Sequence, residues 1–148
     1  MHTENSIWIA ASPERVFALA ADIASWPALL PHYRWVKIIE EQPNERLVEM
    51  AARRSGIPVK WTSVQRLYPE AGRITYRHLR GLTVGMDVEW QVIAQAGGAA
   101  AVIIHELAPR HILLRNPLGA WIASELFIKN IADRTLWHIK AAAEKMGD

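Results

Sequence analysis

The sequence predicts an α+β domain in which a curved, seven-stranded antiparallel sheet wraps around a long C-terminal helix. Two observations lead to this fold class. Between residues 33 and 107, apolar and polar residues alternate with the period of two that is typical of strands. From residue 116 to residue 146, apolar residues recur every three or four positions, as they do in an amphipathic helix. Such a helix cannot bury its apolar stripe alone, so we expect the sheet to cover it.

The chain opens with a strand and two short helices. Residues 5–10 are rich in strand-forming types. Residues 12–14, Ser-Pro-Glu, then supply an N-cap, a proline at the first helical position and an acid in the first turn, which together predict a helix start. Residues 25–27, Ser-Trp-Pro, break this helix, and we expect one more short turn before Pro31.

Six further strands follow in hairpin succession. Short turn segments separate them, so the strands form an antiparallel meander, and the first strand must pair with one of its edges. The clearest alternation places Met86, Val88, Trp90 and Val92 on one face. The predicted strands are residues 35–40, 47–53, 59–67, 73–80, 86–92 and 101–107.

The last third of the chain predicts one continuous helix. Asn116 is a good N-cap, Pro117 suits a first helical position, and Gly147 is a helix stop. A helix of about 30 residues would be about 45 Å long. Its apolar stripe begins with Leu118 and Trp121, which we therefore expect to face the sheet.

Composition excludes several classes of protein. The 148 residues suit a single domain, residues 1–148, and the 51% apolar content excludes a disordered chain. There is no cysteine, and no His/Asp/Glu spacing of a metal site occurs, so we expect no disulfide, metal or cofactor. No apolar run reaches the ~18 residues that span a bilayer. Residues 1–6 have no signal-peptide pattern, so we expect a cytoplasmic protein without stable membrane insertion.

The charge balance argues against nucleic-acid binding. The 17 Lys and Arg residues face 15 Asp and Glu residues, and strand alternation spreads the local excess of arginines over outward positions. A nucleic-acid-binding protein needs a concentrated basic face instead.

Several short motifs together resemble a known family. They are residues 4–7, 11–17 (Ala-Ser-Pro-Glu-Arg-Val-Phe), 22–27 (Asp-Ile-Ala-Ser-Trp-Pro), 61–63 and 86–90. With Tyr33 and the long terminal helix, they resemble the polyketide cyclase/dehydrase family of the START-like superfamily, which is also called the SRPBCC or Bet v 1-like helix-grip superfamily. The resemblance covers essentially the whole chain.

The resemblance implies a deep apolar cavity between the sheet and the terminal helix. Trp26 and Tyr33 match aromatic residues at the cavity mouth, while Trp61, Ser63 and Trp90 match inward sheet positions. The alternative for the tryptophans is that they fill the core or plug the helix–loop corner. The ligand-binding residues predicted on this basis are Trp26, Tyr33, Trp61, Ser63, Gln65, Met86, Val88, Trp90, Ile103 and Trp121.

Three residues are candidates for chemistry: Tyr33, Gln65 and His105. In aromatase/cyclases of this family an arginine occupies the position of Gln65, where it is thought to orient the substrate and act as an acid. Glutamine cannot supply that charge. His105 shares a strand face with Ile103 and Leu107, so it is either an acid/base facing inward or a hydrogen-bonded core histidine.

Two functions therefore remain open. One is a cyclase/dehydrase that folds a polyketone and promotes its aldol condensation and dehydration. The other is a non-catalytic carrier of a lipid or a quinone, which the missing arginine favours. Both require a hydrophobic small-molecule partner, and neither decides between a monomer and a homodimer.

Overall fold

The structure, a computed structural model, describes residues 1–54, 56–108, 111, 114–121 and 128–145. Its strands are β1 (His2–Ile9), β2 (Tyr33–Gln42), β3 (Glu45–Arg54), β4 (Ile57–Tyr68), β5 (Arg73–Gly81), β6 (Asp87–Gln95) and β7 (Gly98–Glu106). Its α-helices are α1 (Pro13–Ala21), α2 (Trp26–Leu29), α3 (Pro117–Trp121) and α4 (Asn130–Lys145), with 3-10 turns at Ile23–Ser25 and Pro69–Ala71.

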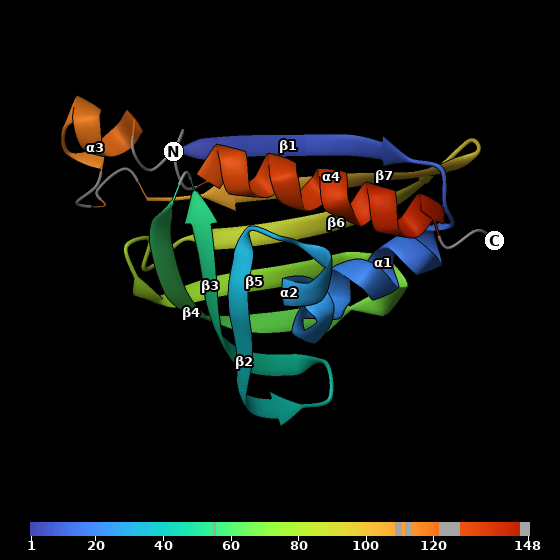
Figure 1. Cartoon of the computed structure of the whole chain (residues 1–148), viewed down its shortest axis with the longest axis horizontal. Helices are drawn as coiled ribbons and strands as arrows, with labels where there is room; N and C mark the ends of the chain where they lie inside the picture. The colour runs from blue at the N-terminus through green and yellow to red at the C-terminus, as the bar shows by residue number, and fades with distance from the viewer. Residues whose placement is uncertain (55, 109–110, 112–113, 122–127, 146–148) are drawn as a thin grey trace.

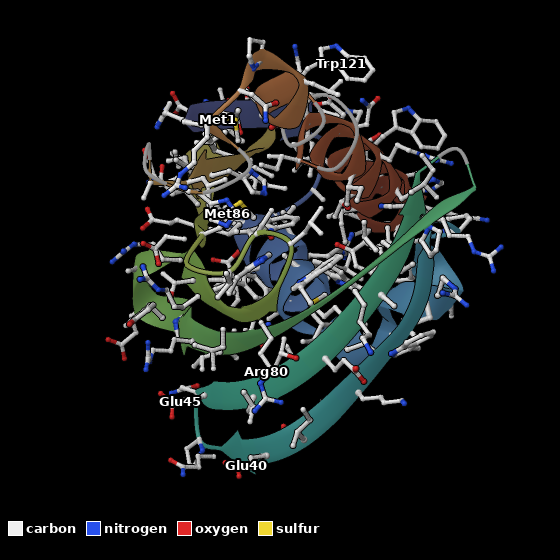
Figure 2. All side chains as sticks on the ribbon, turned by 90° about the vertical axis from the view of Figure 1, so that its left-hand side faces the viewer. Met1, Glu40, Glu45, Arg80, Met86 and Trp121 are labelled. Atoms are coloured by element: carbon white, nitrogen blue, oxygen red, sulfur yellow. The ribbon has the colours of Figure 1, made fainter. Side chains whose placement is uncertain are left out.

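The seven strands form one antiparallel sheet in the order β1-β7-β6-β5-β4-β3-β2. The first strand pairs with β7, which confirms that it joins an edge of the meander. The sheet is strongly curved, and β2 and β3 at one edge curl around the helices on its concave side (Figure 2). Register shifts in β2 and between β4 and β5 mark bulges, which increase local bending.

Helix α4 lies across the concave face beside β1, with α1 against its C-terminal half (Figure 1). Its buried residues recur every three or four positions, as the sequence predicted: Ile131, Ala132, Thr135, Leu136, Ile139 and Ala143. The predicted helix-grip architecture, a curved sheet around a C-terminal helix, is confirmed.

The predicted start of α1 is also confirmed, because the Ser12 hydroxyl accepts a hydrogen bond from the Arg15 amide at 3.2 Å. Helix α1 ends at Ala21, shortly before the predicted break at residues 25–27, and the expected short turn before Pro31 is present as α2. Trp26 and Pro27 begin α2, since a proline in the first turn of a helix lacks only an N–H that has no helical partner there.

The continuous helix predicted for residues 116–146 is wrong at its N-terminal end. The described residues form a short α3 at one end of the molecule, separate from α4 (Figure 1), while residues 122–127 and 146 lie outside the described residues. Leu118 and Trp121 are 66% and 55% exposed, so they do not face the sheet. A periodic pattern records spacing along the chain, and it cannot show whether a surface stands opposite.

None of the described helices is long and apolar enough to cross a membrane.

Candidate functional site

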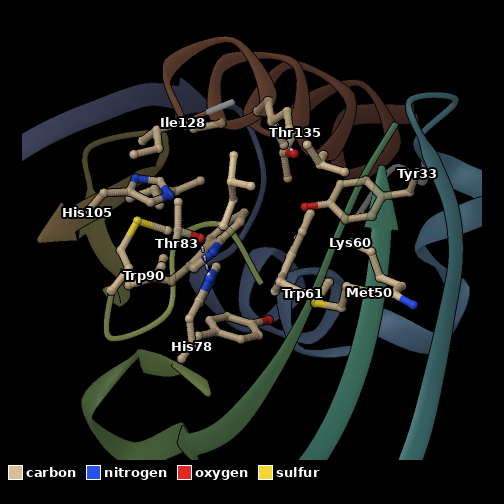
Figure 3. A pocket seen from close by; sticks show the side chains of 18 of the residues that line it. Tyr33, Met50, Lys60, Trp61, His78, Thr83, Trp90, His105, Ile128 and Thr135 are labelled. Carbon is tan, nitrogen blue, oxygen red and sulfur yellow. Dashed lines mark hydrogen bonds between the residues drawn. The ribbon is translucent and has the colours of Figure 1, made fainter. Parts of the chain in front are cut away.

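A cavity lies between the concave face of the sheet and the N-terminal half of α4. The space open to the centres of water molecules is about 90 Å³, which is below the roughly 300–1,000 Å³ typical of sites for drug-sized ligands. Aromatic rings form much of its wall (Figure 3); they belong to Trp26, Tyr33, Trp61, Tyr76 and Trp90.

The aromatic rings hold one another in place. Trp26 packs edge-on against Tyr33, with centroids 5.2 Å apart, and lies 5.9 Å from Trp90. Tyr33 in turn meets Trp61 at 6.1 Å. The Trp26 indole N–H donates to the Leu19 carbonyl at 3.1 Å. Trp26 therefore both lines the cavity and anchors the corner after α1, so its two alternative roles coexist.

The resemblance implied that Trp26 and Tyr33 lie at the mouth of the cavity, but the exposed lining residues are others. Trp26 and Tyr33 are buried and form inner wall, whereas the lining residues Lys60 and Leu82 are exposed. The Lys60 ammonium is 3.5 Å from the Glu49 carboxylate. Among the described lining residues, Lys60 alone carries a fixed charge.

Thr135 of α4 organises one polar corner of the cavity. Its hydroxyl donates to the Ile131 carbonyl at 2.7 Å and accepts from His32 Nε2 at 2.9 Å. The Tyr33 hydroxyl also hydrogen-bonds to Thr135. Burial lowers the pKa of His32 to about 4 and raises the pKa of Tyr33 above its ordinary value. Both side chains are therefore neutral at pH 7.

His78 of β5 forms a second polar corner. Its ring stacks on Trp61 at 5.8 Å, and its Nδ1 lies 2.9 Å from the Thr83 hydroxyl. Backbone hydrogen bonds from His78 N to Met86 O and from Gly85 N to His78 O fix the connection between β5 and β6 over the cavity. Burial lowers the pKa of His78 to about 4.

His105 faces the cavity from β7, as its position on the predicted strand indicated. It is buried, and its Nδ1 has no hydrogen-bond partner among the described residues. Burial, with a smaller effect of His78, lowers the pKa of His105 to about 3. The wall of the cavity thus holds a neutral imidazole with one buried ring nitrogen that has no partner among the described residues.

The other predicted ligand-binding residues separate into two groups. Met86, Val88 and Ile103 line the cavity beside Trp61 and Trp90. Ser63, Gln65 and Trp121 do not. Trp121 is exposed because α3 leaves the sheet. Ser63 and Gln65 point inward as predicted and are fully buried, but neighbouring side chains cover them. Facing the interior is therefore not sufficient to border the cavity.

Sequence reasoning left the facing of His78 open and missed other lining residues, notably Tyr76, Thr83 and Thr135. Alternation along β5, where Tyr76 and His78 flank the exposed Arg77, could have placed both side chains of that strand. Thr83 lies between strands and has no such signal, and Thr135 is one polar residue within an apolar helical stripe.

Comparison with known proteins gives a consistent result. A family model described as "Polyketide cyclase / dehydrase and lipid transport" matches residues 1–144. The chain is 27% identical over 100 residues to the actinorhodin polyketide synthase bifunctional cyclase/dehydratase of Streptomyces coelicolor, which covers 66% of this chain and 32% of that protein. The chain thus spans about one third of the length of this curated relative.

Two solved structures share the fold. The Zhui aromatase/cyclase from Streptomyces sp. R1128 superimposes with a TM-score of 0.81 at 23% identity, covering 100% of this chain and 96% of that one. A START superfamily protein from Mycobacterium smegmatis superimposes with a TM-score of 0.72 at 15% identity, covering 98% of both chains. These likenesses confirm the START-like fold.

Proposed function

This chain belongs to the polyketide cyclase/dehydrase and lipid transport family, and on that premise we propose that it binds a hydrophobic, carbonyl-bearing molecule in the cavity and acts on it as a cyclase/dehydratase. The observation that carries the proposal is the buried His105 imidazole, which faces an aromatic cavity with an unpartnered Nδ1 among the described residues. A purely apolar guest could not satisfy that nitrogen, and an unpaired buried polar group costs stability.

The imidazole fits a proton-transfer role in an aldol condensation. His105 Nδ1 accepts a proton from the carbon between two carbonyls, and the enolate carbon then forms a bond to a second carbonyl carbon, whose oxygen takes the proton back. A second proton transfer from carbon to His105, and from His105 to the new hydroxyl, expels water and restores the neutral ring. Tyr33 supplies a phenol that stays protonated next to the bound molecule.

The low pKa of His105 restricts the substrate class. Burial makes His105 a weak base, so proton abstraction is least unfavourable from the most acidic C–H group of a substrate. The carbon between two carbonyls of a poly-β-ketone is such a group, whereas the methylenes of a lipid chain or a quinone tail are not. The proposal therefore favours a polyketone.

The size of the cavity restricts the reacting part of the substrate. A space of about 90 Å³ accepts the segment that forms one ring. The rest of a longer chain then extends past Lys60 and Leu82 through the mouth.

Turnover of a synthetic triketo thioester tests the proposal. Liquid chromatography with mass detection should show the cyclised product that has lost one water, formed faster than in buffer. His105→Gln should slow that reaction at least tenfold, since a positioned acid/base contributes about 10²–10⁴ in rate. His2→Gln, which changes an exposed histidine on β1 that does not line the cavity, is the control and should match the wild type. Binding of the thioester without any acceleration would instead identify a carrier.

A further inference from the structure

Tyr76 of β5 holds an unusual place in the wall of the cavity. It lines the cavity and is buried, and its register partner on β4 is Gln65. Gln65 Nε2 donates a hydrogen bond to the Tyr76 hydroxyl oxygen at 3.0 Å. An amide nitrogen only donates, so this contact leaves the proton of the Tyr76 hydroxyl unused. No side-chain or backbone atom of the described residues accepts that proton.

The amide of Gln65 is fixed in this orientation from both ends. Its Nε2 also donates to the Ala21 carbonyl at 3.3 Å, and its Oε1 accepts from Arg46 Nη1 at 3.5 Å. The Ala21 carbonyl is the last of α1, where no helical partner remains for it. A flipped amide would set its oxygen against that carbonyl, so the donor end must point toward Tyr76.

Arg46 places a positive charge behind this amide. Its Nη1 donates to the Ala21 carbonyl at 3.2 Å, and its Nε is 2.8 Å from the Glu41 carboxylate. The guanidinium is mostly screened from solvent, with 23% of its side chain exposed. It does not line the cavity, and its hydrogen bond to Gln65 links it to the cavity wall.

The three side chains therefore form a directed chain from a cation, through an amide, to a phenol in the cavity wall. Burial raises the pKa of Tyr76, while the hydrogen bond from Gln65 and the charge of Arg46 act in the opposite direction. The phenol thus remains protonated at pH 7, and the hydrogen bond to its oxygen makes it a stronger donor than an isolated phenol.

We infer that Tyr76 donates a hydrogen bond to a carbonyl or enolate oxygen of the bound substrate, and that Gln65 and Arg46 are its positioning residues. The inference rests on the proposed function, because it needs an oxygen-bearing guest. It gives Gln65 a role that does not require contact with the substrate. A fixed donor aimed at an oxygen on which charge develops lowers the barrier to enolate formation.

Spectroscopy of a non-reacting guest tests the inference without turnover. Acetophenone offers one ring and one carbonyl, and ethylbenzene has nearly the same shape without the oxygen. The carbonyl stretching band of bound acetophenone should lie at lower wavenumber in the wild type than in Tyr76→Phe. The Phe variant should also bind acetophenone roughly three- to tenfold more weakly, as expected for one hydrogen bond, and should bind ethylbenzene unchanged.

Two further variants test which residues determine the position of the carbonyl band. Arg46→Met should move the band part of the way toward its position in Tyr76→Phe, which a merely structural role would not do. Tyr68→Phe, which removes the phenol of an exposed tyrosine, should leave the band where it is. An identical band in wild type and Tyr76→Phe would overturn the inference.

A measurement on the unmutated chain guards against a variant that fails to fold. The chain has three tyrosines, so with tyrosine isotope-labelled at the hydroxyl-bearing carbon, Tyr33→Phe and Tyr68→Phe identify the Tyr76 resonance by elimination. Acetophenone should shift that resonance and ethylbenzene should not; equal responses would overturn the inference. Failure of both guests to bind would overturn the proposed ligand binding and this inference together. A shifted band without turnover of the triketo thioester would support Tyr76 as a donor and remove only the catalytic proposal.

Discussion

The two halves of α4 pack against the same sheet but have different surroundings. One half borders the cavity, and the other is packed into a filled core. Residues 128–135 border the cavity, together with aromatic rings, histidines and threonines. Residues 136–143 meet α1 and small aliphatic side chains, and Leu136, Ile139 and Ala143 are fully packed. We call these regions the hollow end and the filled end. Short aliphatic side chains interdigitate to the density of a solid. Rigid rings, fixed edge-on by one another, keep a space open.

The comparison teaches where stability and function reside in this fold. The filled end buries apolar side chains without polar atoms, such as Leu136, Ile139 and Ala143, and burial of that kind stabilises the fold. The hollow end buries imidazoles and hydroxyls, which contribute less to folding and are available to a guest. Three experiments test this division, in order of decreasing expected effect.

Acidification should affect the hollow end most. Burial lowers the pKa of His78 to about 4 and that of His105 to about 3, against about 6.5 in the unfolded chain. The unfolded chain therefore binds these protons first, and the stability conferred by the neutral imidazoles is present above about pH 6.5 and is lost as the pH falls toward 4 and then 3. The loss is on the order of 3 kcal/mol for His78 and ~5 kcal/mol for His105, measurable by urea unfolding at several pH values.

His78→Gln isolates this effect from the titration of carboxylates. The variant should lose less stability than the wild type between about pH 6.5 and 4. His2→Gln is a control of opposite sign, because Glu106 and Glu4 raise the pKa of the exposed His2. Parallel pH profiles for His78→Gln and the wild type would show that the cavity histidines do not set the acid limit.

Shortening a side chain at the filled end should lower the free energy of unfolding and leave the affinity for a guest unchanged. Ile139→Ala removes a fully buried side chain between α4 and its neighbours, and we expect a loss of about 3 kcal/mol in the free energy of unfolding. The acetophenone dissociation constant should stay within about twofold, because Ile139 does not line the cavity. Trp137→Ala, at an exposed position on the same helix, should change stability by less than about 0.5 kcal/mol. A weakened guest affinity in Ile139→Ala would mean that the two ends are coupled.

Truncation at the hollow end should give the reverse pattern. Trp90 borders the cavity and packs against Trp26, so Trp90→Ala removes a wall that a guest would contact. Because part of the ring already faces empty space, we expect a stability loss of about 2–3 kcal/mol, at or below the usual range for a buried tryptophan. Acetophenone affinity should fall at least tenfold by calorimetric titration. Unchanged affinity would exclude Trp90 from the binding site.

The fold was predictable because local patterns determine it. Ser12 and Pro13 fix the start of α1, and alternation along β4 and β6 fixes which side chains turn inward. His105 faces inward for the same reason, since the buried residues of β7 alternate with half-buried ones. Consecutive hairpins left only one way to order the strands β2 to β7, and the first strand then needed an edge. The catalytic roles of Tyr33 and His105 remain predictions.

The site depended on contacts between segments far apart in the chain. Gln65 and His105 both face inward, yet Gln65 is hydrogen-bonded to Tyr76 away from the cavity and His105 lines it. The arrangement around Thr135 joins residues about a hundred positions apart, and α3 leaves the sheet although its apolar spacing continues the stripe of α4. Sequence periodicity determines which side of an element is buried. Only tertiary packing decides whether that side meets a partner, a filled core or a cavity, because volume and hydrogen-bond geometry are properties of several segments at once.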